Sequence, residues 1–197
     1  MRSDTQRNRR QLIKAAGELY AARRGPISMT DVAKEAGISF ATAYRQFASV
    51  DDILAEYRFG VGEKLREFSL KQETSGLELL AAVSRKWVDL VVRHGGAMLY
   101  TRSGEGYLAR LRQGAFYLTV QAEALERPLH EACDDLGVEP LGDEALFLWN
   151  ILFDPREILD LINTVGLKND EAAARLVSAL RGALSGYSQD RTSPEPR

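Results

Sequence analysis

Four side chains of one short segment have the chemistry needed to contact DNA. Phe40, Thr42, Tyr44 and Arg45 are predicted to share the outward side of a helix that Ser39 caps. Arginine and hydroxyl groups bind phosphates or base edges, and apolar side chains contact thymine methyl groups. Two aromatics, a hydroxyl and an arginine are unusual on a solvated helix, so this segment is predicted to enter a DNA groove. The complete outward face is Phe40, Ala41, Thr42, Tyr44 and Arg45.

The preceding segment provides the elements that would position this helix. Ser28 can cap an earlier short helix, with Asp31 three residues on as the acid of a capping box. Gly37 permits the left-handed backbone of a tight turn between two helices, and Ser39 then starts the second helix. Two short helices set at a sharp angle allow one to enter the major groove while the other contacts the backbone.

The same segment resembles the DNA-binding domain of TetR-type (tetracycline-repressor-like) transcriptional regulators. The resemblance covers about a quarter of the chain, from Arg9 to Leu54. The matching residues are Ala15–Tyr20, Thr30–Ala33, Ala36–Ser39, Thr42, Tyr44, Arg45, Phe47 and Asp51–Leu54. The resemblance implies a homodimeric, ligand-responsive regulator, a repressor that a small-molecule effector releases from a palindromic double-stranded DNA operator.

The resemblance also implies which residues bind DNA. They are Ser28, Ser39, Phe40, Ala41, Thr42, Tyr44 and Arg45. Thr42 and Tyr44 would hold phosphates, whereas Phe40 and Arg45 would approach base edges. The two serines would cap helices beside the DNA backbone.

Four positions depart from the family pattern, among them Gln46, where the family usually has an aromatic residue. Phe40 stands where the family often has a basic residue, Ala41 where it often has glycine, and Val50 where it very often has lysine. Phe40 and Ala41 favour apolar contact with thymine methyl groups. Val50 cannot reach a phosphate as lysine does, so the backbone amides at the start of its helix would bind the phosphate instead.

Charge is distributed unevenly along the chain. The 197 residues carry a formal net charge of −2. Residues 1–47 hold nine basic and four acidic side chains, and the other 150 residues hold 17 basic and 24 acidic ones. The basic end contains the predicted helix-turn-helix, which favours nucleic acid there and a different role for the acidic remainder. A nucleoid-type, non-specific DNA binder would be strongly basic instead.

Cysteine usage and hydropathy predict a cytoplasmic protein without membrane contact. The single cysteine, Cys133, permits no intramolecular disulfide, which fits a reducing compartment. No apolar run approaches the roughly 20 residues that span a bilayer, and the N-terminus lacks the apolar stretch of a signal peptide. Hydrophobic residues make up 45% of the chain, enough for a sizeable core.

Helical periodicity and turn residues predict an all-α fold of about nine helices. The expected units are a three-helix, helix-turn-helix DNA-binding domain over 1–49, a helical effector-binding and dimerisation domain over 50–187, and a disordered tail over 188–197. A long helix that Ser49 caps would run to about residue 72 and join the two domains.

Glycine and proline predict where the larger domain is interrupted. Five glycines between 95 and 114 are expected to break that region into loops with at most a short helix, after a helix that ends near His94. Pro128 is expected to kink or split a helix over 112–136. Asp154 and Pro155 would cap a continuation of the helix over 143–153 to about residue 165, because proline fits the first helical turn.

The last helices are more apolar than one buried face requires. A two-fold partner could bury the surplus in a four-helix bundle. The predicted dimer interface is Phe147, Ile151, Ile158, Ile162, Leu176, Leu180 and Leu184. The alternative is that these stripes pack on the rest of their own domain.

An effector pocket is expected between the helices of the larger domain, because helical bundles hold ligand sites there. The predicted lining is Trp87, Phe116, Tyr117, Val120 and Trp149. Each of these side chains could equally belong to the core.

No arrangement of residues predicts catalysis, a metal or a cofactor. The segment Gly104–Ala109 matches a loose dinucleotide fingerprint but follows no strand. Glu126, His130 and Cys133 or Asp134 could share a helix face, yet nothing completes four metal ligands. The main alternative function is a helical small-molecule-binding protein or enzyme without operator-specific regulation, which would show no basic N-terminal bias.

Overall fold

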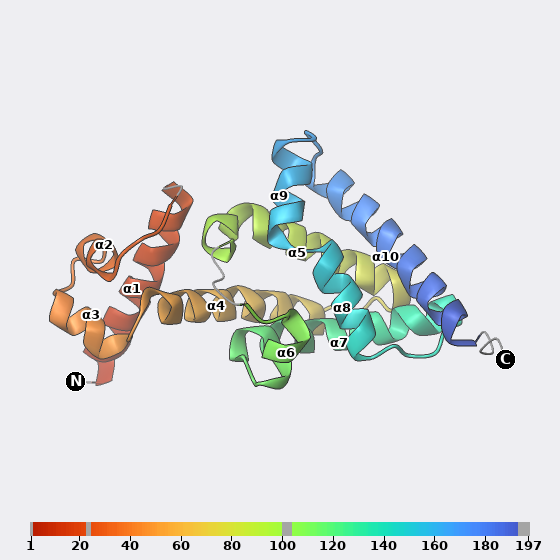
Figure 1. Cartoon of the computed structure of the whole chain (residues 1–197), viewed down its shortest axis with the longest axis horizontal. Helices are drawn as coiled ribbons and strands as arrows, with labels where there is room; N and C mark the ends of the chain where they lie inside the picture. Colours follow the sequence, from red (N-terminus) through yellow and green to blue (C-terminus); the bar gives the residue numbers. More distant parts are fainter. Residues whose placement is uncertain (1, 23–24, 100–103, 193–197) are drawn as a thin grey trace.

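The computed structural model describes residues 2–22, 25–99 and 104–192, which Figure 1 shows as an elongated, wholly helical molecule. These residues form ten helices and no strand, so the predicted all-α class is confirmed. One of them is a six-residue helix within the glycine-rich region, where at most a short helix was expected. Among the described residues, no helix combines the length and apolarity needed to cross a membrane.

The helices follow the order and nearly the limits that periodicity predicted. The N-terminal helices are α1 (Arg2–Ala22), α2 (Met29–Glu35) and α3 (Phe40–Gln46). The middle helices are α4 (Val50–Leu70), α5 (Gly76–Met98), α6 (Tyr107–Arg112) and α7 (Phe116–Leu136). The C-terminal helices are α8 (Asp143–Leu152), α9 (Pro155–Asn163) and α10 (Asn169–Thr192).

One hydrophobic core forms where α1, α2, α3 and the start of α4 meet. Leu12, Val32, Ala43 and Ile53 have no exposed surface in it. The last turn of α5 adds Ala97, so this N-terminal core includes a residue from far along the chain.

A second core lies among α4, α5 and the helices from α7 to α10. Its largest fully buried side chains are Trp149 and Phe153, around which leucines such as Leu65, Leu80 and Leu125 pack. In Figure 1, α4 leaves the N-terminal unit and continues along α7 into the larger body. A displacement of α4 would therefore be felt in both cores.

Two contacts fasten α1 to the larger body. The ring of Tyr57, on α4, packs so closely on Gly17 that a Cβ there would overlap it, and the Tyr57 hydroxyl lies 2.7 Å from Nδ1 of His94 on α5. At the second contact, a Cβ on Gly96 of α5 would overlap the carbonyl oxygen of Tyr20 and lie 2.9 Å from its carbonyl carbon. Only glycine allows these helices to approach so closely.

This close approach explains why the prediction for residues 95–98 was wrong. Gly95 and Gly96 were expected to end α5, but the helix continues through them to Met98. A Cβ at Gly95 would overlap Leu159 of α9, as one at Gly96 would overlap α1. The glycine pair is therefore a packing site for two neighbouring helices, and burial outweighs the low helix propensity of glycine, about 1 kcal/mol per residue.

Two further expectations need correction in part. Pro128 does not split α7, which remains one helix from Phe116 to Leu136 with the proline buried inside it. Packing against both α4 and α5 supports the helix across the missing amide donor. α10 continues to Thr192, into the segment predicted to be a disordered tail, and residues 193–197 lie outside those described.

Candidate functional site

Ser28 and Ser39 cap the N-termini of α2 and α3, at the positions that the sequence predicted. The Ser28 hydroxyl accepts a hydrogen bond from the Asp31 amide at 3.2 Å, and the Asp31 carboxylate accepts one from the Ser28 amide at 3.0 Å. Gly37 has a φ of 65°, the left-handed conformation of a tight turn. The Ser39 hydroxyl then accepts from the Thr42 amide at 3.3 Å. The capping box, the glycine turn and the second cap are thus confirmed.

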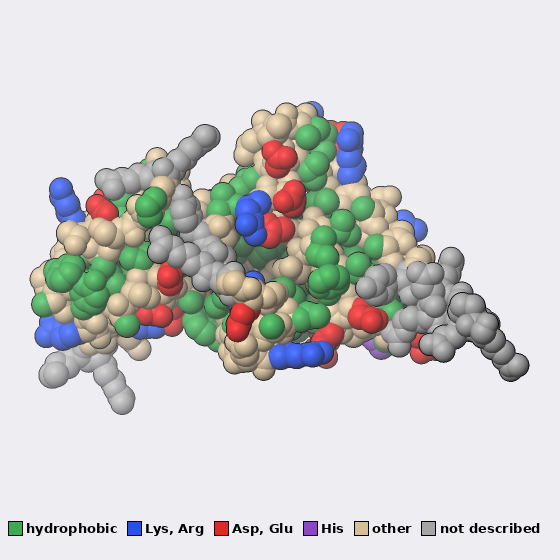
Figure 2. Space-filling view, viewed as in Figure 1, with side chains coloured by type: hydrophobic (Ala, Val, Ile, Leu, Met, Phe, Trp, Pro, Cys, Tyr) green, Lys and Arg blue, Asp and Glu red, His purple; other side chains and the backbone are tan. Residues whose placement is uncertain are grey.

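The α3 surface, formed by Phe40, Ala41, Thr42, Tyr44 and Arg45, faces solvent at one end of the molecule. Phe40 is 52% exposed and Tyr44 is 47% exposed, and their rings meet edge to face with centroids 4.6 Å apart. Thr42 Oγ1 accepts a hydrogen bond from Arg45 at 2.7 Å and lies 2.9 Å from the Ser39 hydroxyl. Figure 2 shows hydrophobic side chains gathered at this end, with basic side chains near them. The aromatic pair and the arginine are held in position before any ligand binds.

Arg9 braces α3 from α1. Its guanidinium donates to the carbonyl oxygen of Gln46 at 3.1 Å and forms an ion pair with Glu56 of α4. It also lies over the Phe47 ring, 4.2 Å from the centroid, a cation–π contact. One side chain therefore sets α3 against both α1 and α4.

The start of α4 lies next to the α3 surface. Ser49 and Asp52 form a second capping box, in which the Ser49 hydroxyl accepts from the Asp52 amide at 3.1 Å. Val50, which replaces the family's frequent lysine, is half-buried against the N-terminal core. This helix end therefore presents backbone amides and no basic side chain at position 50.

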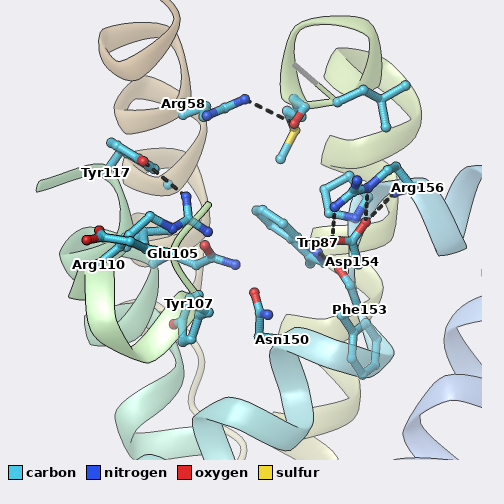
Figure 3. Close-up of a pocket in the computed structure, with 17 residues that line it drawn as sticks. Arg58, Trp87, Glu105, Tyr107, Arg110, Tyr117, Asn150, Phe153, Asp154 and Arg156 are labelled. Atoms are coloured by element: carbon cyan, nitrogen blue, oxygen red, sulfur yellow. Dashed lines mark hydrogen bonds and ion pairs between the residues drawn. The ribbon is translucent and has the colours of Figure 1, made fainter. Parts of the chain in front are cut away.

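The central cavity lies between α4, α5, α6, α7, α8 and α9 and has a volume of about 340 Å³. Its apolar wall includes Trp87, Met98, Leu118 and Phe153. Its polar and charged wall consists of Arg58, Glu105, Tyr107, Arg110, Tyr117, Gln121, Asn150, Asp154 and Arg156. Figure 3 shows these side chains around a common space, with Trp87 and Asn150 directed toward it.

Of the five side chains predicted to line a pocket, Trp87 and Tyr117 do so. Phe116 does not, because it is 44% exposed and packs on Phe59. Val120 is buried against Gly62. Trp149 is fully buried and stacks on Phe153, with ring centroids 5.1 Å apart, so it belongs to the core.

Two arginines that sequence reasoning missed meet at the cavity. Arg110 donates to the Tyr117 hydroxyl at 3.3 Å, while Arg58 lies 5.7 Å from the centroid of the same ring and donates to the carbonyl oxygen of Met98 at 3.3 Å. Burial lowers the pKa of Arg58, Tyr117 counteracts this, the charge of Arg110 lowers the pKa further, and the charge of Asp51 raises it. The spacing of Leu54, Arg58 and Gly62 at every fourth residue could have placed Arg58 on the inner face of its helix.

Two side chains of α6 that line the cavity each have a buried polar atom without a hydrogen-bond partner among the described residues. The atoms are the Tyr107 hydroxyl and Nε of Arg110. Only 6% of Tyr107 is exposed, and burial raises its pKa to about 12, so its hydroxyl stays protonated at neutral pH. Buried donors without partners are uncommon and cost roughly 1–3 kcal/mol each.

The predicted dimer interface divides into exposed and buried residues. Phe147 and Ile151 of α8 are 39% and 50% exposed, and Ile162 is half-buried. Leu176 is almost completely buried. Ile158, Leu180 and Leu184 have no exposed surface, so the prediction that they face a second copy was wrong. They fill the core of their own chain, which is the alternative considered for the apolar stripes.

Other residues with potential chemistry do not assemble into a reactive centre in the described part of the chain. Glu126, His130 and Cys133 line a groove along α7. No three His, Cys, Asp or Glu side chains in 2–22, 25–99 and 104–192 lie close enough to hold a metal ion. Burial raises the pKa of the Cys133 thiol, which keeps it in its less nucleophilic form.

Solved structures with this arrangement of helices are known. A TetR-family transcriptional regulator from Streptomyces coelicolor is 21% identical, with a TM-score of 0.57 over 94% of this chain and 85% of that one. A candidate TetR-family regulator from Vibrio parahaemolyticus is 19% identical, with a TM-score of 0.59 over 89% and 97% of the two chains. A candidate transcriptional regulator from Pseudomonas aeruginosa PAO1 is 14% identical, with a TM-score of 0.59 over 94% and 93%.

No protein-family model matches the chain, and no curated protein matches it in sequence. At such low identity, the structural similarity concerns the arrangement of helices. The similarity extends over both the N-terminal unit and the larger body, beyond the quarter of the chain where the sequence resemblance was seen. The chain therefore has the fold of the TetR-family transcriptional regulators, as its N-terminal segment predicted.

Proposed function

We propose that this chain is a DNA-binding transcriptional regulator, and the observation that carries the proposal is the exposed face of α3. This face carries the edge-to-face ring pair of Phe40 and Tyr44 and the Arg45 side chain, which donates a hydrogen bond to Thr42. Arg9 of α1 holds this short helix in place. Adjacent exposed apolar side chains that form a patch rimmed by polar residues often mark an interaction site. A major groove offers such a surface both base edges and methyl groups.

The residues of the α3 surface would have different tasks. Tyr44 and Thr42 would bind phosphates, which sets the register without reading sequence. Arg45 would reach a base edge, and Phe40 and Ala41 would contact thymine methyl groups. The backbone amides at the start of α4 that the Ser49–Asp52 capping box does not occupy would hold a further phosphate. Sequence preference should therefore depend on Arg45 more than on Tyr44.

Binding to DNA can be tested by enriching sites from a pool of random duplexes and measuring affinity at fixed salt. Arg45→Ala should cost about 1–3 kcal/mol on the enriched site and relax its sequence preference. Tyr44→Phe should weaken binding to all duplexes alike. Arg85→Ala, an exposed arginine on α5 outside the N-terminal unit, is the matched control. Failure to enrich any site, or equal behaviour of Arg45→Ala and Arg85→Ala, would refute the proposal.

The regulator would act as a homodimer through α8 and α10. Phe147 and Ile151 lie one turn apart on α8 and leave an apolar surface in solvent. The exposed face of α10 includes the small residues Ala174, Ser178 and Gly182, which let a partner helix approach closely. Two such helix pairs would form a four-helix bundle about a two-fold axis.

Light scattering tests the dimer. Ile151→Lys should give a folded monomer, because lysine on the bundle surface could not be buried there. Val92→Lys, at another exposed apolar position on α5, should leave the dimer intact. A folded Ile151→Lys dimer would exclude this interface.

The central cavity would hold a small-molecule effector that releases the DNA. Arg58 and Gly62 of α4 line it, and α4 begins beside the α3 surface. Two α3 helices must lie about 34–36 Å apart to enter successive major grooves. A ligand that shifts α4 would change this separation and lower operator affinity. The coupling free energy would be about 1–3 kcal/mol, and operator DNA would lower ligand affinity by the same factor. A ligand that saturates the cavity without changing operator affinity would contradict repression relieved by that ligand.

A further inference from the structure

The side chain of His94 lies where the N-terminal unit joins the larger body. Its ring nitrogen Nδ1 is 2.7 Å from the hydroxyl of Tyr57, whose ring packs on Gly17 of α1. Gly96, two residues further along α5, makes the second contact with α1. We infer that His94 is a pH-sensitive switch: the neutral side chain fastens the DNA-binding unit, and its protonation loosens that unit and weakens operator binding. The effect on operator binding rests on the proposed function.

The hydrogen bonds around His94 require a neutral ring. Nε2 lies 3.5 Å from Nζ of Lys64, and because lysine has only donors, Nε2 is the acceptor and carries no proton. The proton of the neutral ring is then on Nδ1, which donates to the Tyr57 hydroxyl oxygen. Protonation of Nε2 would replace the hydrogen bond from Lys64 with two cations that face each other.

The charges around the ring also oppose its protonation. Among the described residues, the charged groups that act on it are Lys64 of α4 and Arg93 of α5, both positive, so α1, α7, α9 and α10 present none. At this end of α5, α1 approaches through backbone atoms and α9 through the apolar Leu159. Burial of the ring, then the two positive charges, lower the pKa of His94. The fastened state therefore binds the proton less readily than a state with the ring in water.

A protonated ring relieves these costs by moving toward water. Lys64 is exposed and its side chain can swing away, but burial, the largest cause, ends only when the imidazole itself moves. That movement takes Nδ1 away from the Tyr57 hydroxyl and removes the hydrogen bond that holds the Tyr57 ring on Gly17. Because the pKa of His94 is lower in the fastened state, fastening is complete above about pH 6.5, the ordinary pKa of histidine, and is lost as the pH falls below it.

A loosened DNA-binding unit would bind an operator less tightly. The two α3 helices of a dimer must lie about 34–36 Å apart to enter successive major grooves. A unit fastened to α4 and α5 has this separation in advance, whereas a loose unit must be ordered when it binds, which costs affinity. A histidine in contact with DNA would act in the opposite direction, because its positive charge in acid would strengthen binding to phosphates.

The test measures the affinity of the full chain for an enriched duplex at fixed salt, between about pH 7.0 and 5.5, the range in which histidines titrate. Affinity should fall at least about threefold on acidification, and His94→Gln should abolish this fall. The chain has one other histidine, the exposed His130 of α7, so His130→Gln is the matched control and should keep the fall. A constant or rising affinity, the same fall in His94→Gln, or loss of the fall in His130→Gln would overturn the inference.

Three further variants separate titration from a loss of packing, with circular dichroism at both pH values to confirm folding. Lys64→Gln removes one positive charge, so it should raise the pKa of His94 and reduce the fall in affinity. Lys71→Gln removes a charge where α4 ends and should change neither. Tyr57→Phe keeps a ring on Gly17 but lacks the hydroxyl, so its operator affinity should not vary with pH. An unreduced fall in Lys64→Gln and Tyr57→Phe would refute the assignment.

Nuclear magnetic resonance tests the switch without DNA. The Gly17 amide signal of the free protein should move with the same midpoint as the His94 ring signal, and it should stay in place in His94→Gln. If no duplex is enriched, the DNA-binding proposal fails, and these signals alone decide whether His94 controls the fastening of α1. A Gly17 signal that does not follow the His94 titration, or an operator affinity that stays constant while this signal moves, would overturn the inference.

Discussion

Replacing Gly96 by alanine tests whether the contact between α5 and α1 requires a glycine. The added Cβ would overlap the Tyr20 carbonyl oxygen, lie 2.9 Å from the Tyr20 carbonyl carbon and 3.1 Å from the Ala21 Cα. These are backbone atoms of a helix, so they cannot rotate away as a side chain can. The two helices must separate, and overpacking of this kind costs about 1–3 kcal/mol.

Alanine also improves helix propensity by about 0.5–1 kcal/mol, so a control with the same gain is needed. Gly60→Ala provides it, because Gly60 is an exposed residue of α4 with no atom within 4 Å of an added Cβ. We expect Gly96→Ala to be about 1–3 kcal/mol less stable than Gly60→Ala. For a chain of this size, thermal unfolding at equal protein concentration should differ by about 2–4 °C per kcal/mol. Equal melting temperatures would refute the argument for glycine at this contact.

Three further predictions concern single side chains. Leu180→Asp should unfold the chain rather than release folded monomers, since it places a charge in a dry core at a cost above roughly 4 kcal/mol; a folded variant of normal stability in denaturant titrations would contradict this. Arg9→Ala should lower the free energy of unfolding by about 1 kcal/mol and weaken DNA binding, because α3 loses its brace; unchanged affinity would show that the brace is dispensable. Burial, then Lys64 and Arg93, lower the pKa of His94, so the unfolded state takes up the proton first and stability should fall as pH drops below about 6.5. His94→Gln should flatten this part of the stability curve, and an unaltered slope would exclude His94 as its source.

Local features near the N-terminus could be predicted because neighbouring residues determine them. A cap such as Ser28 and its acid Asp31 lie three positions apart, and Gly37 alone supplies the left-handed turn. The outward face of α3 follows from helical period, so Phe40 and Tyr44 are exposed as predicted. None of this needs knowledge of the larger body.

The cavity and the dimer surface depend on contacts between distant segments, which periodicity does not encode. Trp87 and Trp149 have the same chemistry, yet one lines the cavity and the other fills the core. Leu180 lies on an apolar stripe, but which neighbour covers that stripe is decided by the positions of other helices. Arg58 and Arg110 lie far apart in the sequence, and the packing of both α4 and α6 against α7 brings them to the same ring, that of Tyr117.

The two contacts that fasten α1 to the larger body limit how freely this DNA-binding unit can be exchanged. One depends on Gly17 beneath the Tyr57 ring, and the other on Gly96 against the Tyr20 backbone. A unit grafted from another chain at the start of α4 would bring its own residue to position 17 and its own helix surface to Gly96. A chimaera joined there would fold with its new unit misaligned unless a small residue at position 17 and a matching α5 end were carried with it. DNA specificity in this fold is therefore transferred more safely by replacing the exposed residues of α3 than by exchanging the whole unit.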